Sequence, residues 1–306
     1  MKSITAEDIS KTYRRGKESI TALHPVSFSV DRGELFGCIG PDGAGKTSLI
    51  RILATLLLPD SGKATVDGLD IHRDLVAIRK RVGYMPGRFS LYQDLSVEEN
   101  LRFFATIFNT TVEKNQHLIR DIYAQLAPFA HRPAGKLSGG MKQKLALCCA
   151  LIHEPSVLFL DEPTTGVDAV SRKEFWEMLH TLRQRGITIL VSTPYMDEAG
   201  RCDRVALVQD GRFLRVDTPQ GLTHQYPKRV LAVKGEDMYL LLQTLKQEAS
   251  VEIAYPFGEY HHVVIADDVP MDGAYWQKFG VREVQRIEPD IEDCFILEMH
   301  QRQTNT

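Results

Sequence analysis

The sequence lacks any apolar run long enough to cross a membrane. Its longest apolar stretches, such as residues 50–58, are interrupted well before the roughly 18 to 20 residues that a spanning helix needs. Residues 1–13 also lack the apolar central block of a secretion signal, because Lys, Glu, Asp and Ser interrupt them. We therefore expect a cytoplasmic chain that does not cross the membrane itself.

A strong net charge and a metal-type cysteine pattern are also missing. The net charge of −3 gives no bulk attraction to DNA or RNA, which disfavours a nucleic-acid partner. Five cysteines are an odd number, and they lack the spacing of a metal site. We interpret them as reduced packing residues, as in other cytosolic proteins. They are Cys38, Cys148, Cys149, Cys202 and Cys294.

The order of the apolar patterns predicts an α/β fold. Two β-rich stretches, residues 4–13 and 21–30, open the chain and suit an antiparallel sheet. Further along, short apolar runs typical of buried strands alternate with helical periodicity, which predicts a parallel sheet. The runs are residues 35–39, 157–160 and 187–191, and the helices are residues 48–53 and 173–185.

A helical segment is inserted into this core, and a second domain follows it. Residues 95–153 have a helical pattern, with Ser96 as an N-cap three residues before Glu99. This predicts a helical subdomain at about residues 90–153. We expect a large domain of residues 1–219 and a small α/β domain of residues 220–306. The elements expected in the small domain are strands at 229–233 and 261–265 and helices at 238–247 and 291–299.

A phosphate-binding loop joins the first apolar run to its helix. Backbone N–H groups of such a loop curl around phosphates, Lys46 neutralises them, and the Thr47 hydroxyl ligates Mg²⁺ at a helix N-terminus. The alternative is a simple glycine turn between a strand and a helix. The loop consists of Gly40, Pro41, Asp42, Gly43, Ala44, Gly45, Lys46 and Thr47.

Two further segments complete the phosphate chemistry. Asp161 and Glu162 follow a buried strand, where Asp161 suits the Mg²⁺ shell and Glu162 suits a base for the attacking water. Ser138, Gly139 and Gly140 begin a helix and form a candidate anion site of N–H groups and a hydroxyl. Taken alone, the first segment could be a helix cap, and the second could be an ordinary capped turn.

Together, the segments GPDGAGKT, LSGGM, VLFLDEP, GVD and STPYMDEA resemble, in order and spacing, the ATP-binding subunits of ABC transporters. The resemblance covers residues 1–215. Residues 281–295 resemble the C-terminal extension of drug- and antibiotic-resistance-type exporter ATPases. The family implies a P-loop NTPase with a RecA-like parallel-sheet core, an N-terminal antiparallel β subdomain, an inserted helical subdomain and a small C-terminal α/β domain. It also implies ATP and Mg²⁺ as ligands.

The resemblance implies roles for individual residues. Tyr13 matches the aromatic residue that stacks on adenine, although a surface or core tyrosine is the plain alternative. Residues 40–48, ending at Ser48, match the phosphate-binding segment, with Lys46, Asp161 and Glu162 as the catalytic group. Ser138, Gly139 and Gly140 match the signature that contacts ATP held by the opposite subunit, and Asp168 matches the acidic residue of the loop between the two sites. The family thus implies a nucleotide-sandwich dimer.

Two positions depart from the family pattern. Gly87 stands where the family has a glutamine that contacts the metal and the attacking water, and Pro194 stands where it has a histidine that bonds the γ-phosphate. Neither replacement has a polar side chain. We therefore expect the chain to bind MgATP but to hydrolyse it slowly at its own site. Pairing with a different, intact ATPase subunit is favoured, and a homodimer stays open.

The family implies an integral-membrane permease as a partner, on the inner face of the cell membrane. Two alternatives remain open: a regulatory subunit with little hydrolysis, and a soluble ABC ATPase without a transport role. A phosphate-loop kinase would not carry LSGG.

His261 and His262 lie on one predicted strand and point to opposite faces, so we expect structural roles. The basic residues 79–81 are expected to be solvated charge, with membrane-subunit or lipid contact as the alternative.

Overall fold

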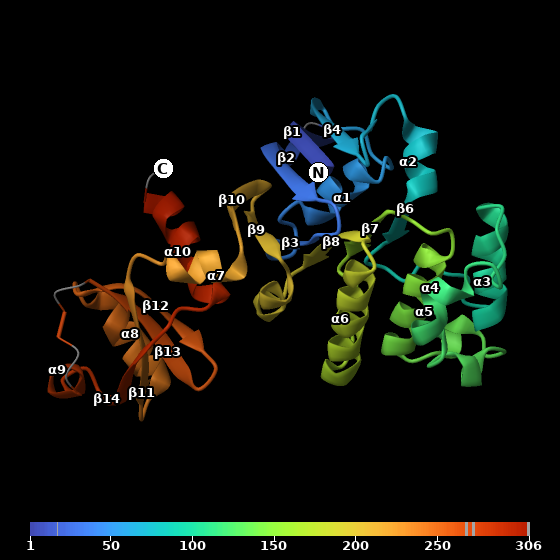
Figure 1. Ribbon diagram of the computed structural model, residues 1–306. Helices are drawn as coiled ribbons and strands as arrows, with labels where there is room; N and C mark the ends of the chain where they lie inside the picture. The colour runs from blue at the N-terminus through green and yellow to red at the C-terminus, as the bar shows by residue number, and fades with distance from the viewer. Residues whose placement is uncertain (17, 267–268, 271–272, 305–306) are drawn as a thin grey trace. The chain divides into compact units, whose positions relative to one another are not determined.

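The computed structural model describes residues 1–16, 18–266, 269–270 and 273–304, and they form two compact units (Figure 1). Unit 1 is Met1–Val216, and unit 2 is Asp217–Thr306. No described helix is long and apolar enough to span a lipid bilayer. All five cysteines are free and buried, which confirms their interpretation as packing residues.

An antiparallel sheet forms the N-terminal part of unit 1. Its strand order is β2-β1-β4-β5. Ile4, Ala6 and Ile9 are buried, and the three-residue step between the last two coincides with a bulge at Asp8, whose φ is 52°. The predicted β-rich stretches are confirmed, and both strands extend beyond the predicted bounds. The strands are β1 (Lys2–Arg15), β2 (Glu18–Asp31), β4 (Ser61–Val66) and β5 (Leu69–Asp70).

The predicted parallel sheet is confirmed and forms the centre of unit 1. Its order is β10-β9-β3-β8-β7-β6, and every pairing from β9 to β6 is parallel. Every residue of β3, β7 and β8 is buried, as expected for strands covered on both faces. Their carboxyl ends therefore lie side by side. The strands are β3 (Leu35–Ile39), β6 (Val82–Met85), β7 (Val157–Asp161), β8 (Thr188–Thr193), β9 (Arg204–Gln209) and β10 (Arg212–Asp217).

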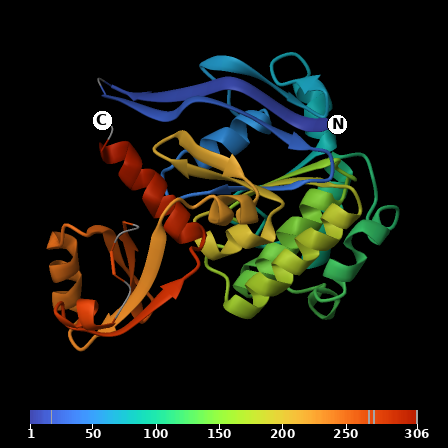
Figure 2. The same cartoon turned by 60° about the vertical axis from the view of Figure 1, so that its left-hand side comes forward.

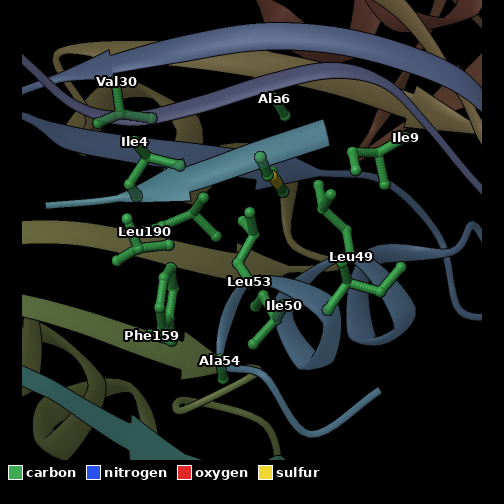
Figure 3. Close-up of a cluster of buried hydrophobic side chains, with 14 of the residues drawn as sticks. Ile4, Ala6, Ile9, Val30, Leu49, Ile50, Leu53, Ala54, Phe159 and Leu190 are labelled. Atoms are coloured by element: carbon green, nitrogen blue, oxygen red, sulfur yellow. The ribbon is translucent and has the colours of Figure 1, made fainter. Parts of the chain in front are cut away.

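Helix α1 (Lys46–Leu53) lies between the two sheets and fixes the end of the phosphate loop. Its Leu49, Ile50 and Leu53 pack with Ile4 from the antiparallel sheet and Phe159 from the parallel sheet (Figure 3). Figure 2 shows the long blue strands β1 and β2 on one side of α1 and the parallel sheet on the other. The remaining helical elements of the core are α2 (Leu75–Arg81), α6 (Ala169–Gln184) and the 3₁₀ turn η3 (Met196–Arg201).

The predicted helical insertion is present between β6 and β7. The capping box predicted for α3 is confirmed, because Ser96 Oγ accepts from Glu99 N at 3.2 Å and Glu99 Oε2 accepts from Ser96 N at 2.8 Å. The insertion consists of α3 (Val97–Ile107), α4 (Gln116–Tyr123), α5 (Gly139–Leu151) and the 3₁₀ turns η1 (Ala127–Phe129) and η2 (Ala134–Lys136).

Unit 2 is built on a four-stranded antiparallel sheet of order β12-β13-β11-β14. The succession β-α-β-β-α-β with this order is the ferredoxin-like topology. The predicted α8 is confirmed at both ends, whereas the last helix runs past the predicted residue 299. The elements are α7 (Pro219–His224), β11 (Arg229–Gly235), α8 (Met238–Gln247), β12 (Val251–Phe257), β13 (Tyr260–Ile265), α9 (Gly273–Gln277), β14 (Val281–Ile287) and α10 (Ile291–Thr304).

Candidate nucleotide site

The phosphate loop connects the end of β3 to the start of α1. Gly45 has a φ of 98°, and a Cβ there would lie 2.2 Å from the backbone oxygen of Ala22. Only glycine fits such a position without strain. The loop borders a pocket of about 130 Å³ lined by residues 43–48, Ala22 and Glu162. Of the loop residues before the pocket, Pro41 is half-buried and Asp42 is exposed.

Lys46 is buried under this loop and is held by three oxygen atoms. Its Nζ donates to the backbone oxygens of Gly40 at 2.7 Å and Pro41 at 2.8 Å. It also lies 3.3 Å from Glu162 Oε1. The structure therefore brings together the lysine of the loop and the acid of a strand more than a hundred residues further along the chain.

Asp161 and Thr47, the two predicted metal ligands, are in direct contact. Thr47 Oγ1 donates to Asp161 Oδ1 at 3.0 Å. Ser192 Oγ donates to the same oxygen at 2.8 Å, because Asp161 and Ser192 are register partners on the neighbouring strands β7 and β8. Hydroxyl and carboxylate oxygens are the donors that Mg²⁺ prefers, so these residues fit that ion. Sequence reasoning missed Ser192.

Glu162 has a strained backbone at the end of β7. Its φ is 50°, in the left-handed region that a residue with a Cβ seldom adopts. Its N–H donates to Ser192 O at 3.1 Å and Ser192 Oγ at 3.0 Å, which fixes the turn. The side chain keeps 22% of its surface exposed. A carboxylate beside the metal ligands and open to solvent can accept a proton from water.

Tyr13 also lies at the phosphate loop. Its hydroxyl is 3.1 Å from Ser48 Oγ, and 41% of the residue is exposed. An exposed ring anchored by its hydroxyl beside α1 can offer a face to an aromatic base.

The two departures from the family pattern both border the site. A Cβ at Gly87 would lie 3.1 Å from the backbone oxygen of Asp161 and 3.7 Å from Glu162 Cβ. Pro194 follows Thr193, whose backbone oxygen accepts from Gly40 N at 3.2 Å. Neither position supplies a polar side chain.

The serine-glycine segment forms a second cluster. Ser138 caps α5 by accepting from Met141 N at 3.3 Å, and Ser138 and Gly139 are exposed. Gly140 is buried against α6, where a Cβ would lie 2.5 Å from Ser171 Oγ. Within the described ranges, no hydrogen bond or ion pair connects this cluster to the phosphate loop.

Asp168 belongs to the same cluster. It caps α6 by accepting from Ser171 N at 3.0 Å, and this hydrogen bond lowers the pKa of its carboxyl. The predicted site residues thus divide into two groups: one around Lys46, and one around the start of α5 and α6.

Known proteins resemble this chain in sequence and in fold. A family model described as "ABC transporter" matches residues 23–165. The chain is 35% identical over 97% of its length to Nod factor export ATP-binding protein I of Rhizobium etli, and it covers 93% of that protein. The chain belongs to the ATP-binding subunits of ABC transporters. It is therefore an ATP-binding protein of an ATPase family, and the resemblance seen in the sequence is confirmed.

Another relative is longer than this chain. The probable multidrug ABC transporter ATP-binding protein YbhF of Escherichia coli is 40% identical over 90% of the chain, but the chain spans only 48% of YbhF. Among solved structures, the cassette MJ0796 in a dimeric post-hydrolysis state with ADP and Pi aligns with a TM-score of 0.64 and 25% identity, over 70% of this chain and 98% of that one. An ATP-binding subunit of an ABC transporter aligns with a TM-score of 0.65 and 28% identity, over 73% and 92% of the two chains.

Proposed function

We propose that this chain is the ATP-driven motor subunit of a membrane exporter of the multidrug type. The cluster of Lys46, Asp161 and Glu162 beside the phosphate loop carries the proposal. The names of the relatives support the direction of transport, because they describe a probable multidrug transporter and a Nod factor exporter. The substrate is selected by the membrane subunit.

Each member of the phosphate cluster has a distinct role in this proposal. When ATP binds, Lys46 Nζ contacts the phosphates in place of the backbone oxygens of Gly40 and Pro41. Tyr13 stacks on adenine. Thr47 and Asp161 hold Mg²⁺, which neutralises phosphate charge when it is bound. Glu162 accepts the proton of the attacking water.

The second group of residues serves a neighbouring subunit. Ser138 and Gly139 are exposed at the N-terminus of the 13-residue helix α5, beside the loop that ends at Asp168. Free N–H groups and the helix dipole at such a position favour a phosphate. Because this group lies apart from the chain's own phosphate loop, we assign it to ATP bound by a second ABC ATPase subunit.

The chain's own site is slow in this proposal. Gly87 and Pro194 border Asp161 and the phosphate loop but cannot contact the attacking water or the γ-phosphate with a side chain. One such contact contributes about 3 to 4 kcal/mol to the transition state, or two to three orders of magnitude in rate. The intact serine-glycine segment can still complete the site of a different ATPase subunit, so we favour a heterodimer over a homodimer.

The permease contact is proposed at an apolar groove of unit 1. The groove has a volume of about 370 Å³ and runs between β6, α3 and α5. Leu56 and Ile107, which are more than half exposed, lie at its edge, and Pro86 connects it to Gly87. An apolar helix of a membrane subunit fits such a groove. We therefore propose that residues 1–219 are the nucleotide-binding domain, on the inner face of the membrane, and that residues 220–306 are an accessory domain.

The deciding experiment compares wild type with the double variant Gly87→Gln, Pro194→His. Equilibrium MgATP binding and steady-state turnover are measured for both proteins. We expect tight binding with negligible turnover for wild type. For the double variant, which restores two such contacts, we expect turnover to rise by at least about two to three orders of magnitude.

A matched control separates the effect of the added polar side chains from the effect of the changed backbone and packing. The variant Gly87→Ala, Pro194→Ala introduces the same close approach to Asp161 and removes the proline, but it adds no polar side chain. It should stay slow. Robust wild-type turnover would contradict the slow site and favour a homodimer. Tight binding that neither variant converts into turnover would favour an ATP-binding regulatory subunit instead.

A further inference from the structure

Glu198 is a buried carboxylate that no step of the proposed reaction uses. It lies in η3, four residues after Pro194, and only 1% of its surface is exposed. One of its oxygens, Oε2, accepts from the hydroxyls of Thr193 and Thr164, the latter at 3.2 Å. Glu198 therefore ties together the two loops that follow the neighbouring strands β7 and β8.

The other oxygen of Glu198 lacks a donor. Oε1 is buried without a hydrogen-bond partner in the described part of the chain, and the nearest cation, Arg172 Nε, is 3.9 Å away. A buried charged oxygen without a hydrogen bond is unfavourable. The Arg172 guanidinium also lies over the ring of Tyr195, with its Cζ at 4.9 Å from the ring centroid. Its Nη2 is 3.7 Å from Asp197 Oδ2. A small movement of this loop would bring the Arg172 guanidinium into direct contact with Oε1.

Glu198 and Arg172 lie between the two groups of residues that are proposed to bind nucleotide. On one side, the backbone oxygen of Thr193 accepts from Gly40 N of the phosphate loop at 3.2 Å. On the other side, Arg172 directly follows Ser171, whose N–H donates to the capping Asp168 and whose side chain lies against Gly140. In Figure 1, α6 begins beside the ends of β7 and β8. A continuous set of contacts thus runs from the phosphate loop through Glu198 to the start of α6.

We propose that Glu198 is a positioning residue that couples the nucleotide loop to the start of α6 by closing onto Arg172 when MgATP binds. Binding at Gly40 and Lys46 shifts the Thr193–Glu198 segment, and Oε1 then accepts directly from Arg172. The inference rests on the proposed nucleotide site. Its effect is to align Asp168 and Gly140 for the second subunit only when this chain has bound ATP.

The test uses two isosteric or near-isosteric variants and a built-in reporter. Glu198→Gln keeps an oxygen for the two threonine hydroxyls but turns an amide N–H group toward Arg172. Arg172→Met removes the guanidinium and keeps the apolar stem. Trp176 is fully buried one helical turn after Arg172, so Trp276→Phe in unit 2 leaves a single tryptophan that reports on α6.

MgATP affinity and Trp176 fluorescence are measured for the parent, both single variants and the double variant. A hydrogen bond between charged groups predicts about a tenfold loss of MgATP affinity in each single variant. We expect the double variant to lose no more than either single variant, because both remove the same contact. The Trp176 response to MgATP should disappear in all three. Arg183→Met, which removes an ion pair with Asp203 further along α6, should keep both the affinity and the response.

Each outcome decides between the explanations. Losses that add up in the double variant, or a Trp176 response that persists in both single variants, would show that Glu198 only stabilises its loop. If Glu198→Gln does not fold, Arg172→Met still decides the question, because its side chain is partly exposed and its response can be measured alone. If the parent protein itself does not bind MgATP, the proposed nucleotide site fails, and not only the coupling.

Discussion

At the scale of single residues, the Ser192 hydroxyl connects the two acids of the nucleotide site. It donates to Asp161 Oδ1 and accepts from Glu162 N. Residues that orient a metal ligand typically change metal affinity by about tenfold or more when they are removed. We expect Ser192→Ala to raise the Mg²⁺ concentration needed for half-maximal ATP binding by about tenfold, as measured by a metal titration at fixed ATP.

Two controls accompany this prediction. ATP binding without Mg²⁺ should be unchanged in Ser192→Ala, because the loop around Lys46 keeps its own contacts. Thr188→Val, at the opposite end of β8, removes a hydroxyl that accepts from Gly33 N and should leave the Mg²⁺ requirement unchanged. An equal loss of binding with and without Mg²⁺ would mean that Ser192 supports the loop and not the metal.

The sequence predicted much of this site because its central residues lie in motifs with a fixed order. Lys46, Thr47, Asp161 and Glu162 were all found from strand ends and glycine spacing. Ser192 was not, because its importance comes from the register that places it opposite Asp161 on the next strand. Residues in one sequence do not reveal which strands become neighbours or in which register. Glu198 was missed for the same reason, since one hydroxyl donor is at the end of β8 and the other lies in the loop after β7.

At the scale of elements, the N-terminus of α10 is connected to the sheet of unit 2 through one carboxylate. Asp293 accepts from Asp290 N at 2.7 Å, from His262 Nδ1 at 2.8 Å and from the Tyr255 hydroxyl. Burial raises the pKa of Asp293, but the hydrogen bonds from His262 and Tyr255 outweigh it and hold the pKa below its usual value. His262 therefore has a structural contact, while His261 bonds Met238 O on the opposite face at 2.6 Å.

These contacts predict an acid-sensitive unit 2. A carboxyl whose pKa is lowered by folding contributes stability above its unfolded pKa, and this contribution is lost as the pH falls through the folded pKa. The half-buried neighbour Asp290 has a raised pKa, mainly because of desolvation, and its effect on the pH dependence of stability is opposite to that of Asp293. We expect Asp293→Asn to destabilise unit 2 at neutral pH by about 2 to 3 kcal/mol and to flatten its loss of stability in acid.

Trp276 lies in the core of unit 2, so its fluorescence in a Trp176→Phe background follows the unfolding of this unit. Denaturation is measured from neutral to acidic pH. Glu288→Gln removes a carboxylate from an exposed residue just before α10 and should behave as wild type. If Asp293→Asn keeps the wild-type pH dependence, the contacts of Asp293 are not the cause of the acid sensitivity.

Local patterns predicted some elements better than others. The capping box of α3 and both ends of α8 were found, because capping side chains and helical periodicity act within a few residues. Strands β12 and β14 were not predicted. In strand β12, Val251, Ile253, Tyr255 and Phe257 do alternate, but Pro256 interrupts the run and argues against a strand. Strand β14 lacks apolar alternation, because four of its seven residues are exposed. Their pairing with β13 and β11 holds them in the sheet.

At the scale of the whole molecule, the two separate groups of residues proposed to bind nucleotide predict complementation between copies of the chain. The experiment uses the background Gly87→Gln, Pro194→His, in which the chain's own site is expected to turn over. Lys46→Ala removes the phosphate loop function from one copy, and Ser138→Arg blocks the anion site at α5 of the other. Each variant alone should be nearly inactive, because every ATP in a symmetric dimer then lacks one of its two sides.

An equal mixture of the two variants should recover about a quarter of the parental turnover, since half of the dimers are mixed and each mixed dimer has one intact site. Recovery would establish that the group around Ser138 acts on ATP held by another subunit. Full activity of the Ser138 variant alone would contradict that assignment. If the parent binds MgATP but neither turns over nor recovers activity on mixing, this chain does not pair productively with itself even when its site is restored. The second ATPase subunit must then be a different protein, because the exposed Ser138 and Gly139 would have no use in a single chain.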